Sequence, residues 1–131
     1  MMQVNWEDKI VLVVDDTKMN FVLLKSQLRK TNAATVWIEN GYDAVQYVKN
    51  RNKVDLILMD IRMPIMDGIE ASRTIKEINP DIPILMQTAS VMGSAFEEIS
   101  ISNCDDTIFK PIDAKILIDK ITQQFEKYSK K

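Results

Sequence analysis

The chain of 131 residues contains no histidine, and this absence excludes several classes of function. Without an imidazole, the chain cannot build a Ser-His-Asp or Cys-His nucleophile system, a histidine-ligated metal centre or a phosphohistidine of its own. Its single cysteine, Cys104, cannot form an internal disulfide or a multi-thiolate zinc site, which favours a reduced, cytoplasmic setting. Any chemistry here must use carboxylates, hydroxyls and amines.

Long apolar runs and an excess of positive charge are also missing. No run approaches the roughly 20 apolar residues of a membrane-spanning helix, and the opening MMQVNWEDK lacks the basic and apolar segments of a signal peptide. The formal net charge is −2, so we expect neither a nucleic acid nor a membrane as a direct partner. An apolar fraction of 46% without linker-like stretches predicts a single domain over residues 1–131.

Short apolar runs, rich in β-branched residues and leucine, recur along the chain. They are Lys9–Val14, Ala34–Ile38, Val54–Met59, Ile82–Gln87 and Asp106–Lys110. Their lack of polar alternation is typical of strands covered on both faces of a parallel sheet. Apolar residues at helical spacing lie between and after them, most clearly at Ala114, Leu117, Ile118, Ile121 and Phe125. This alternation predicts an α/β fold with a doubly wound, five-stranded parallel sheet and five helices.

Several helix ends can be placed from the sequence. Asp67 can cap the helix that begins after it, and Asn79-Pro80 stops that helix. Gly41 precedes a second helical pattern. The fourth helix, expected around Met92 to Ser102, has the weakest pattern, because glycine and serine lower its helical propensity.

Polar residues stand at the ends of the predicted strands. Asp15 and Asp16 follow the first strand, Asp60 follows the third, Thr88 follows the fourth, and Lys110 ends the fifth. Because ligands of open parallel sheets bind outside the carboxyl ends of the strands, we expect these side chains to share one crevice. Clustered carboxylates require a cation, and an all-oxygen ligand set favours a hard ion, Mg²⁺ in particular. An aspartate nucleophile, a cation, an ammonium and a hydroxyl together suit phosphoryl transfer.

Four strings of the sequence resemble those of response regulator receiver domains. They are VVDD at Val13–Asp16, MDIRMPIMDG at Met59–Gly68, TAS at Thr88–Ser90 and FKP at Phe109–Pro111. The resemblance covers essentially the whole chain, and the second string is especially similar to receivers of hybrid sensor histidine kinases. Each string alone is weak evidence for this family, whereas the four strings together, in this order and each at a strand end, are a specific signature of it. The resemblance implies a flavodoxin-like strand order, 2-1-3-4-5.

The resemblance also implies a phosphoacceptor of two-component signalling rather than a separate turnover enzyme. Asp60 would accept a phosphoryl group from a histidine of a sensor histidine kinase or a histidine phosphotransfer protein. Asp16, Asp60 and the main-chain carbonyl of Arg62 would bind Mg²⁺, with Asp15 acting through water and Mn²⁺ as an alternative ion.

Further roles follow from the same resemblance. Thr88 and Lys110 would contact the phosphoryl group, and the Lys110–Pro111 bond would be cis. Phosphorylation would shift the last two helices and the strand between them, presenting a surface to a downstream protein or to a second copy of the chain in a homodimer.

The sequence departs from the family pattern at two positions. Receivers commonly carry an aromatic residue where Thr107 stands, and we hypothesise that Phe109, on the same strand face, replaces the missing ring. Asn103 stands where glycine is common, and asparagine tolerates the left-handed backbone that can end a helix. Phe96 or Ile101 is expected to be partly exposed.

Alternatives remain open at this point. Taken singly, Asp15 and Asp16 could cap a helix, and Asp60 could belong to an ordinary turn. A haloacid-dehalogenase-like phosphatase also uses an aspartate and Mg²⁺, but it would want a second acid where Arg62 stands. A flavodoxin-like cofactor binder needs a phosphate-cradling glycine loop, which the three scattered glycines cannot form. A docking-only relative of receivers is disfavoured because every site residue is present.

Overall fold

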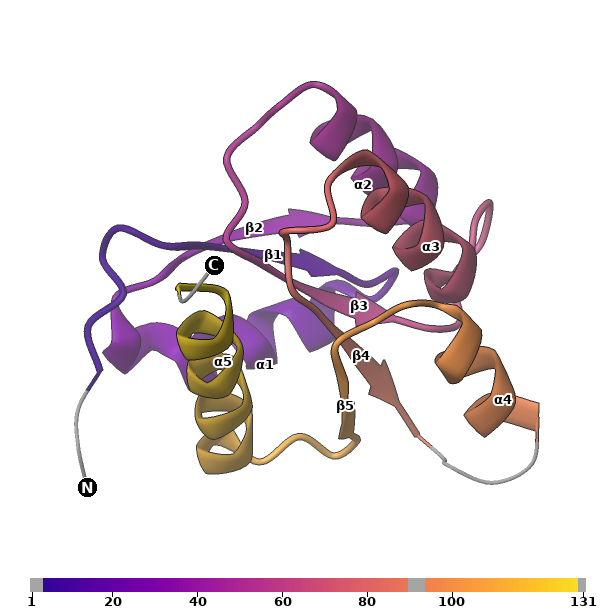
Figure 1. The fold of residues 1–131 in the computed structure, drawn as a ribbon. Coiled ribbons are helices and arrows are strands. Elements are labelled where there is room, and N and C mark those ends of the chain that lie inside the picture. The colour runs from indigo at the N-terminus through magenta and orange to yellow at the C-terminus, as the bar shows by residue number, and fades with distance from the viewer. Residues whose placement is uncertain (1–3, 90–93, 130–131) are drawn as a thin grey trace.

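The computed structural model describes residues 4–89 and 94–129, which form five strands alternating with five α-helices (Figure 1). The strands are β1 (Ile10–Val14), β2 (Ala34–Ile38), β3 (Leu56–Asp60), β4 (Ile84–Thr88) and β5 (Asp106–Phe109). The helices are α1 (Lys18–Leu28), α2 (Gly41–Lys49), α3 (Gly68–Ile78), α4 (Ser94–Ile101) and α5 (Ala114–Ser129), with a short 3-10 helix, η1 (Arg29–Thr31), after α1.

The strands form one parallel sheet in the order β2-β1-β3-β4-β5, which confirms the predicted doubly wound fold. Strand order reverses between β1 and β3, and a doubly wound sheet binds its ligands at the carboxyl end of such a switch point. Along β1 and β3, Val14 pairs with Met59, so the residues after Val14 come to lie beside Asp60. The topology therefore brings Asp15 and Asp16, which follow β1, close to Asp60 at the carboxyl end of β3.

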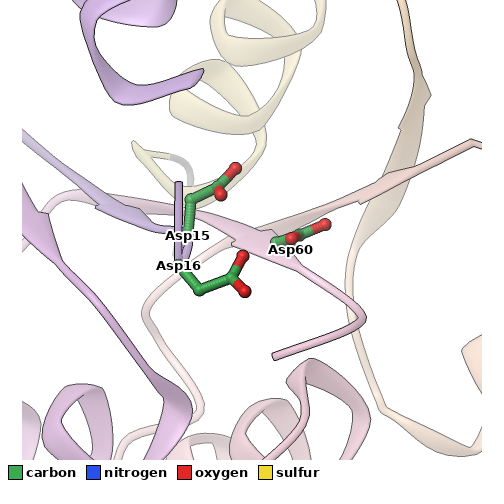
Figure 2. A group of neighbouring side chains, drawn as sticks. All are labelled: Asp15, Asp16 and Asp60. Atoms are coloured by element: carbon green, nitrogen blue, oxygen red, sulfur yellow. The ribbon is translucent and has the colours of Figure 1, made fainter. Parts of the chain in front are cut away.

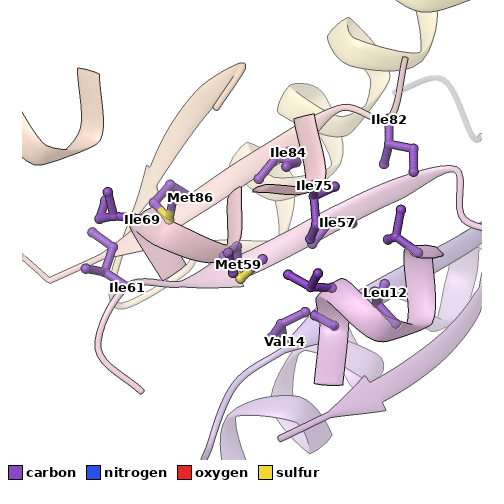
Figure 3. Packing of buried hydrophobic residues seen from close by; sticks show 14 residues of the cluster. Leu12, Val14, Ile57, Met59, Ile61, Ile69, Ile75, Ile82, Ile84 and Met86 are labelled. Carbon is purple, nitrogen blue, oxygen red and sulfur yellow. The ribbon is translucent and has the colours of Figure 1, made fainter. Parts of the chain in front are cut away.

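Both faces of the sheet are covered by helices. Leu12 and Val14 of β1 belong to a buried cluster that includes Ile75 and that packs α2 and α3 on one face (Figure 3). Val11 and Val13 alternate with them and belong to a second cluster, which packs α1 and α5 on the other face. Because both faces need apolar residues, the strand sequences carry no polar alternation. The sheet is thus a rigid support for the loops at its carboxyl edge.

The predicted element ends hold with small shifts. Asp67 caps α3 by accepting the Glu70 N–H at 2.9 Å, and α3 ends at Ile78, immediately before Asn79, as predicted. β4 begins only after Pro83, since proline has no N–H to give to a neighbouring strand. β3 reaches one residue further than predicted because Asp60 still pairs with Gln87.

The α4 region agrees with the sequence in part. The helix ends at Ile101, close to the prediction, whereas its expected start at Met92 lies outside the described residues. Asn103 has a φ of 64°, which confirms the left-handed turn expected after the helix. Within the described ranges, none of the helices combines the length and apolarity of a membrane span.

Candidate functional site

Three carboxylates meet at the carboxyl ends of β1 and β3. Figure 2 shows Asp15 and Asp16 at the end of one strand and Asp60 at the end of its neighbour. One ligand oxygen from each of the three lies within 4.8 Å of the others. Asp15 and Asp60 are buried and Asp16 is exposed, so the cluster opens to solvent on one side. The prediction that these three acids come together is confirmed.

Asp15 is fully buried and is held by local hydrogen bonds. Its Oδ1 accepts the Thr17 N–H at 2.9 Å, and its Oδ2 accepts from the Asn20 amide at 3.2 Å. Burial raises the pKa of the Asp15 carboxyl and the nearby Asp60 raises it further, while the Thr17 N–H opposes the shift. A buried acid beside a second acid is a group whose ionised form gains from a bound cation.

Asp60 is anchored by two hydrogen bonds, both of which the structure shows on Oδ1. The Lys110 ammonium donates to it at 3.0 Å, and the Ile61 N–H donates at 3.0 Å. The Lys110 backbone N–H in turn donates to the carbonyl of Thr88 at 2.9 Å, which ties the ends of β4 and β5 together. The Lys110–Pro111 peptide bond is cis, as the family resemblance implied.

Two open cavities lie beside the carboxyl end of β3. One, of about 430 Å³, has Asp16, Arg62, Met63, Pro64 and Asp67 in its lining. The other, of about 320 Å³, is lined by Asp60, Ile61, Arg62, Gln87, Thr88, Ala89 and Lys110. Thr88 and Lys110 therefore lie where the sequence predicted. Arg62 lines both cavities, while the role of its main-chain carbonyl as a metal ligand stays a prediction.

The donor set of the crevice fits a small, hard cation. Among the described residues, the metal-ligating side chains that converge here are three carboxylates, and the Lys110 ammonium offsets the charge of one of them. Mg²⁺ binds through one or two carboxylates and keeps several waters, which the open cavity beside Asp16 can accommodate. These residues are therefore compatible with Mg²⁺.

Two supporting residues were missed by the sequence reasoning. Gly68, the first residue of α3, lies so close to β3 that a Cβ there would be 2.0 Å from the Asp60 carbonyl oxygen. The indole N–H of Trp37 donates to the Asp15 carbonyl at 2.8 Å, and its ring stacks on Phe21 with centroids 5.8 Å apart. The glycine after Asp67 was a usable signal for the first contact, whereas nothing in the sequence around Trp37 indicated the second.

The predicted output surface is described in part. Phe109 and Ile101 are 48% and 56% exposed, which confirms the expected exposure of Ile101. The side chain of Phe96 lies outside the described residues. Thr107 is half-buried, and the hypothesis that Phe109 replaces the missing aromatic ring stays a prediction.

Comparison with known proteins identifies a family model and relatives that match this chain. The family model of the response regulator receiver domain matches residues 11–122. A hybrid signal transduction histidine kinase of Dictyostelium discoideum is 39% identical over 126 residues, covering 90% of this chain and 7% of that protein. The chain thus spans only a small fraction of this relative.

Solved structures with the same fold include two at 27% identity. The first is the receiver domain of a sensor histidine kinase from Pseudomonas aeruginosa with a magnesium ion coordinated in its active-site cleft; the TM-score is 0.82, covering 90% of this chain and 98% of that one. The second is a co-crystal structure from Saccharomyces cerevisiae of a histidine phosphotransfer signalling protein and the receiver domain of its downstream response regulator. Its TM-score is 0.80, covering 95% of this chain and 91% of that one.

Proposed function

Because the chain belongs to the response regulator receiver domain family of two-component signalling, we propose that Asp60 accepts a phosphoryl group from a histidine of a partner protein in a Mg²⁺-dependent reaction. The observation that carries this proposal is the position of Asp60, within reach of Asp15, Asp16 and the Lys110 ammonium. Residues 1–131 then act as one receiver domain, either as a stand-alone regulator or as part of a longer histidine kinase.

In the proposed reaction, a carboxylate oxygen of Asp60 attacks the phosphorus of the phosphohistidine. The new O–P bond forms as the P–N bond breaks, and the electron pair of that bond stays on the imidazole nitrogen, which takes up a proton. The Lys110 ammonium, 3.0 Å from Oδ1, can follow the phosphoryl oxygens, and the Thr88 hydroxyl can donate to another of them. Both groups stabilise the charge that the transferring phosphoryl carries on its equatorial oxygens.

A bound Mg²⁺ would neutralise charge between the acceptor carboxylate and the incoming phosphoryl group. Asp16 and Asp60, with the Arg62 main-chain carbonyl, would hold the ion directly, and Asp15 would act through water. The burial of Asp15 near Asp60 supports this assignment, because burial raises the pKa of its carboxyl and a bound cation would favour the ionised form.

The phosphoryl donor is a sensor histidine kinase or a histidine phosphotransfer protein. A donor has to bring its imidazole nitrogen into contact with Asp60, so it also has to cover the rim of the crevice. That rim includes α1, which begins two residues after Asp16 and exposes three large apolar side chains, Met19, Val22 and Leu23. Exposed apolar residues gathered on one element favour a protein partner. Neither a nucleic acid nor a membrane is proposed as a direct partner, and the exchange is placed in the cytoplasm.

Phosphorylation then changes the surface formed by α4, β5 and α5. The phosphoryl group adds a charge of about −1.5 to −2 at Asp60 and three strong acceptors. Thr88 and Lys110 can follow these oxygens together, because the Lys110 N–H donates to the Thr88 carbonyl. Phe109 and Ile101 lie half-exposed on this surface, where a downstream protein or a second copy of the chain would read the change.

The test is phosphorylation with a small donor. We expect incubation with acetyl phosphate and Mg²⁺ to add the mass of one phosphoryl group to the chain, and Asp60→Asn to abolish the gain. Asp119→Asn, at an exposed position of α5, is the matched control and should label normally. Continuous release of phosphate without a labelled protein would favour the phosphatase alternative, and equal labelling of Asp60→Asn would refute the proposed acceptor.

A further inference from the structure

Gln87 is a buried polar residue that follows three apolar residues of β4. It follows Ile84, Leu85 and Met86 in β4, and its side chain is 1% exposed. Among the described residues, neither its Oε1 nor its Nε2 has a hydrogen-bond partner. Buried amides in folded proteins are nearly always hydrogen-bonded, because a buried donor or acceptor without a partner destabilises the folded state. A strand position that needs only an apolar side chain therefore carries one that is unfavourable in the unphosphorylated chain.

The position of Gln87 connects it with the acceptor. The strand register pairs Gln87 with Asp60 on β3 and with Ile108 on β5. Paired residues of neighbouring parallel strands point to the same face of the sheet, so the amide lies in the same row as the Asp60 carboxylate. Lys110 reaches this row from the end of β5, since its ammonium contacts Asp60. Gln87 also lines the cavity that contains Asp60, Thr88 and Lys110.

We propose that the Gln87 amide is a further ligand of the phosphoryl group on Asp60. Its Nε2 would donate to a phosphoryl oxygen, and its Oε1 would accept from the Lys110 ammonium when that ammonium moves from Asp60 to the phosphoryl group. An amide offers both a donor and an acceptor, so one side chain can meet both partners. This inference rests on the proposed function, because it requires Asp60 to be the acceptor.

The energetic consequence is a bond that is gained only after phosphorylation. In the unphosphorylated chain, the amide is buried without a described partner and destabilises the fold. In the phosphorylated chain, a phosphoryl oxygen would accept from Nε2 and the Lys110 ammonium would donate to Oε1. An apolar replacement of the same volume should therefore stabilise the unphosphorylated chain and weaken the binding of the phosphoryl group. A residue with a purely structural role would not produce this pair of effects.

The experiment uses trifluoroberyllate, a non-covalent mimic of a phosphoryl group, with Mg²⁺ in isothermal titration calorimetry. Gln87→Met keeps the volume and removes both polar atoms. We expect this variant to unfold at a higher temperature than the wild type without the mimic, and to bind the mimic about tenfold more weakly, the effect of losing one hydrogen bond to a charged group.

The chain offers a matched control in Gln124. This residue is also buried, at 6% exposure, and its Oε1 likewise lacks a partner among the described residues. It lies about 15 Å along α5 from the end next to Lys110, given the rise of about 1.5 Å per residue. Gln124→Met should therefore change the unfolding temperature and leave the affinity for the mimic at the wild-type value.

The outcomes separate the two proposals. If the wild type binds no mimic in the presence of Mg²⁺, both the proposed function and this inference are overturned. If the wild type binds and Gln87→Met binds equally well, only the role of Gln87 is overturned. Should Gln87→Met not fold, the side-chain amide resonances of Gln87 in the wild type provide the test. They should shift and exchange more slowly with solvent when the mimic binds, and unchanged resonances would overturn the inference.

Discussion

Substitution of Gly68 by alanine should disturb the contact between the start of α3 and the end of β3, which carries Asp60. A Cβ at this position would lie 2.0 Å from the Asp60 carbonyl oxygen, 2.9 Å from its carbonyl carbon and 3.0 Å from the Ile61 Cα. All three neighbours are backbone atoms, so no side chain can rotate away. Because Cβ atoms do not approach such atoms closer than about 3.0 Å, either the start of α3 or the end of β3 has to move by about 1 Å.

The size of the effect follows from two opposing contributions. Overpacking of this kind costs about 1–3 kcal/mol, whereas replacing glycine by alanine in a helix returns about 0.5–1 kcal/mol. We therefore expect Gly68→Ala to lower the free energy of unfolding by about 1–2 kcal/mol. For a chain of this length, that corresponds to a fall of about 4–8 °C in the melting temperature. A displacement of about 1 Å at a reacting carboxylate can slow its reaction by about 10²-fold.

The assays are thermal denaturation and the rate of Mg²⁺-dependent labelling by acetyl phosphate. Gly41→Ala is the matched control, because a Cβ at Gly41 would lie 2.6 Å from the Met66 carbonyl oxygen and 2.9 Å from the Ala71 Cβ, with no close contact to Asp60. This variant should be destabilised but should label at nearly the wild-type rate. If both variants lost labelling to the same degree, the rate would follow overall stability and the positional argument for Gly68 would be refuted.

Three further predictions follow from other groups. Asp15→Asn removes a buried carboxylate that lies beside Asp60, so we expect a higher melting temperature in EDTA and a smaller gain on adding Mg²⁺; an undiminished gain would contradict a role in ion binding. Asp105→Ala leaves Lys76 without the carboxylate now 2.7 Å from its ammonium, and denaturation should show a loss of about 3 kcal/mol with labelling by acetyl phosphate intact. Burial raises the pKa of the Cys104 thiol, so alkylation by iodoacetamide should be slower than that of glutathione at pH 7.5, and its rate should keep rising with pH above about 8.5, where the rate of an ordinary thiol begins to level off; an equal rate at pH 7.5 would contradict this shift.

Much of the fold could be predicted from local patterns. Val13 and Val14 are adjacent yet belong to opposite buried clusters, and only a strand covered on both faces requires such a run. The strand order is different, because no periodicity carries it; the order came from the resemblance of the motifs. Strand ends shifted by one or two residues where pairing decided them, as at Asp60, whose pairing with Gln87 extends β3.

Some residues of the site could be predicted from the sequence and others could not. Asp15, Asp60 and Lys110 could be placed because each stands where a strand ends, and strand ends of a parallel sheet meet at one edge. Trp37 and Gln87 could not. The contact of Trp37 with Asp15 depends on how β2 lies beside β1. Gln87 stood at the end of the predicted apolar run Ile82–Gln87, and no role was predicted for it. A polar residue directly after the apolar residues Ile84, Leu85 and Met86 was the signal available for Gln87.

Buried aspartates lie at both ends of the strands, but their surroundings differ. At the amino-terminal edge, Asp105 accepts the Ile84 N–H at 2.7 Å and the Tyr128 hydroxyl at 2.5 Å, besides its ion pair with Lys76. Charge and hydrogen-bonding capacity are matched there, so those groups stabilise the fold without needing a ligand.

At the carboxyl ends of the strands, charge and hydrogen-bonding capacity are not matched within the described part of the protein. Asp15 is buried beside a second acid and has a raised pKa, and the Gln87 amide has no partner among the described residues. Each of these groups lowers the stability of the unphosphorylated, metal-free chain, and a single cation with a single phosphoryl group would satisfy both. Buried polar atoms without a described partner also occur elsewhere, at Gln27, Ser72 and Gln124, so the combination of such an amide with clustered carboxylates and an ammonium is what distinguishes this end of the sheet.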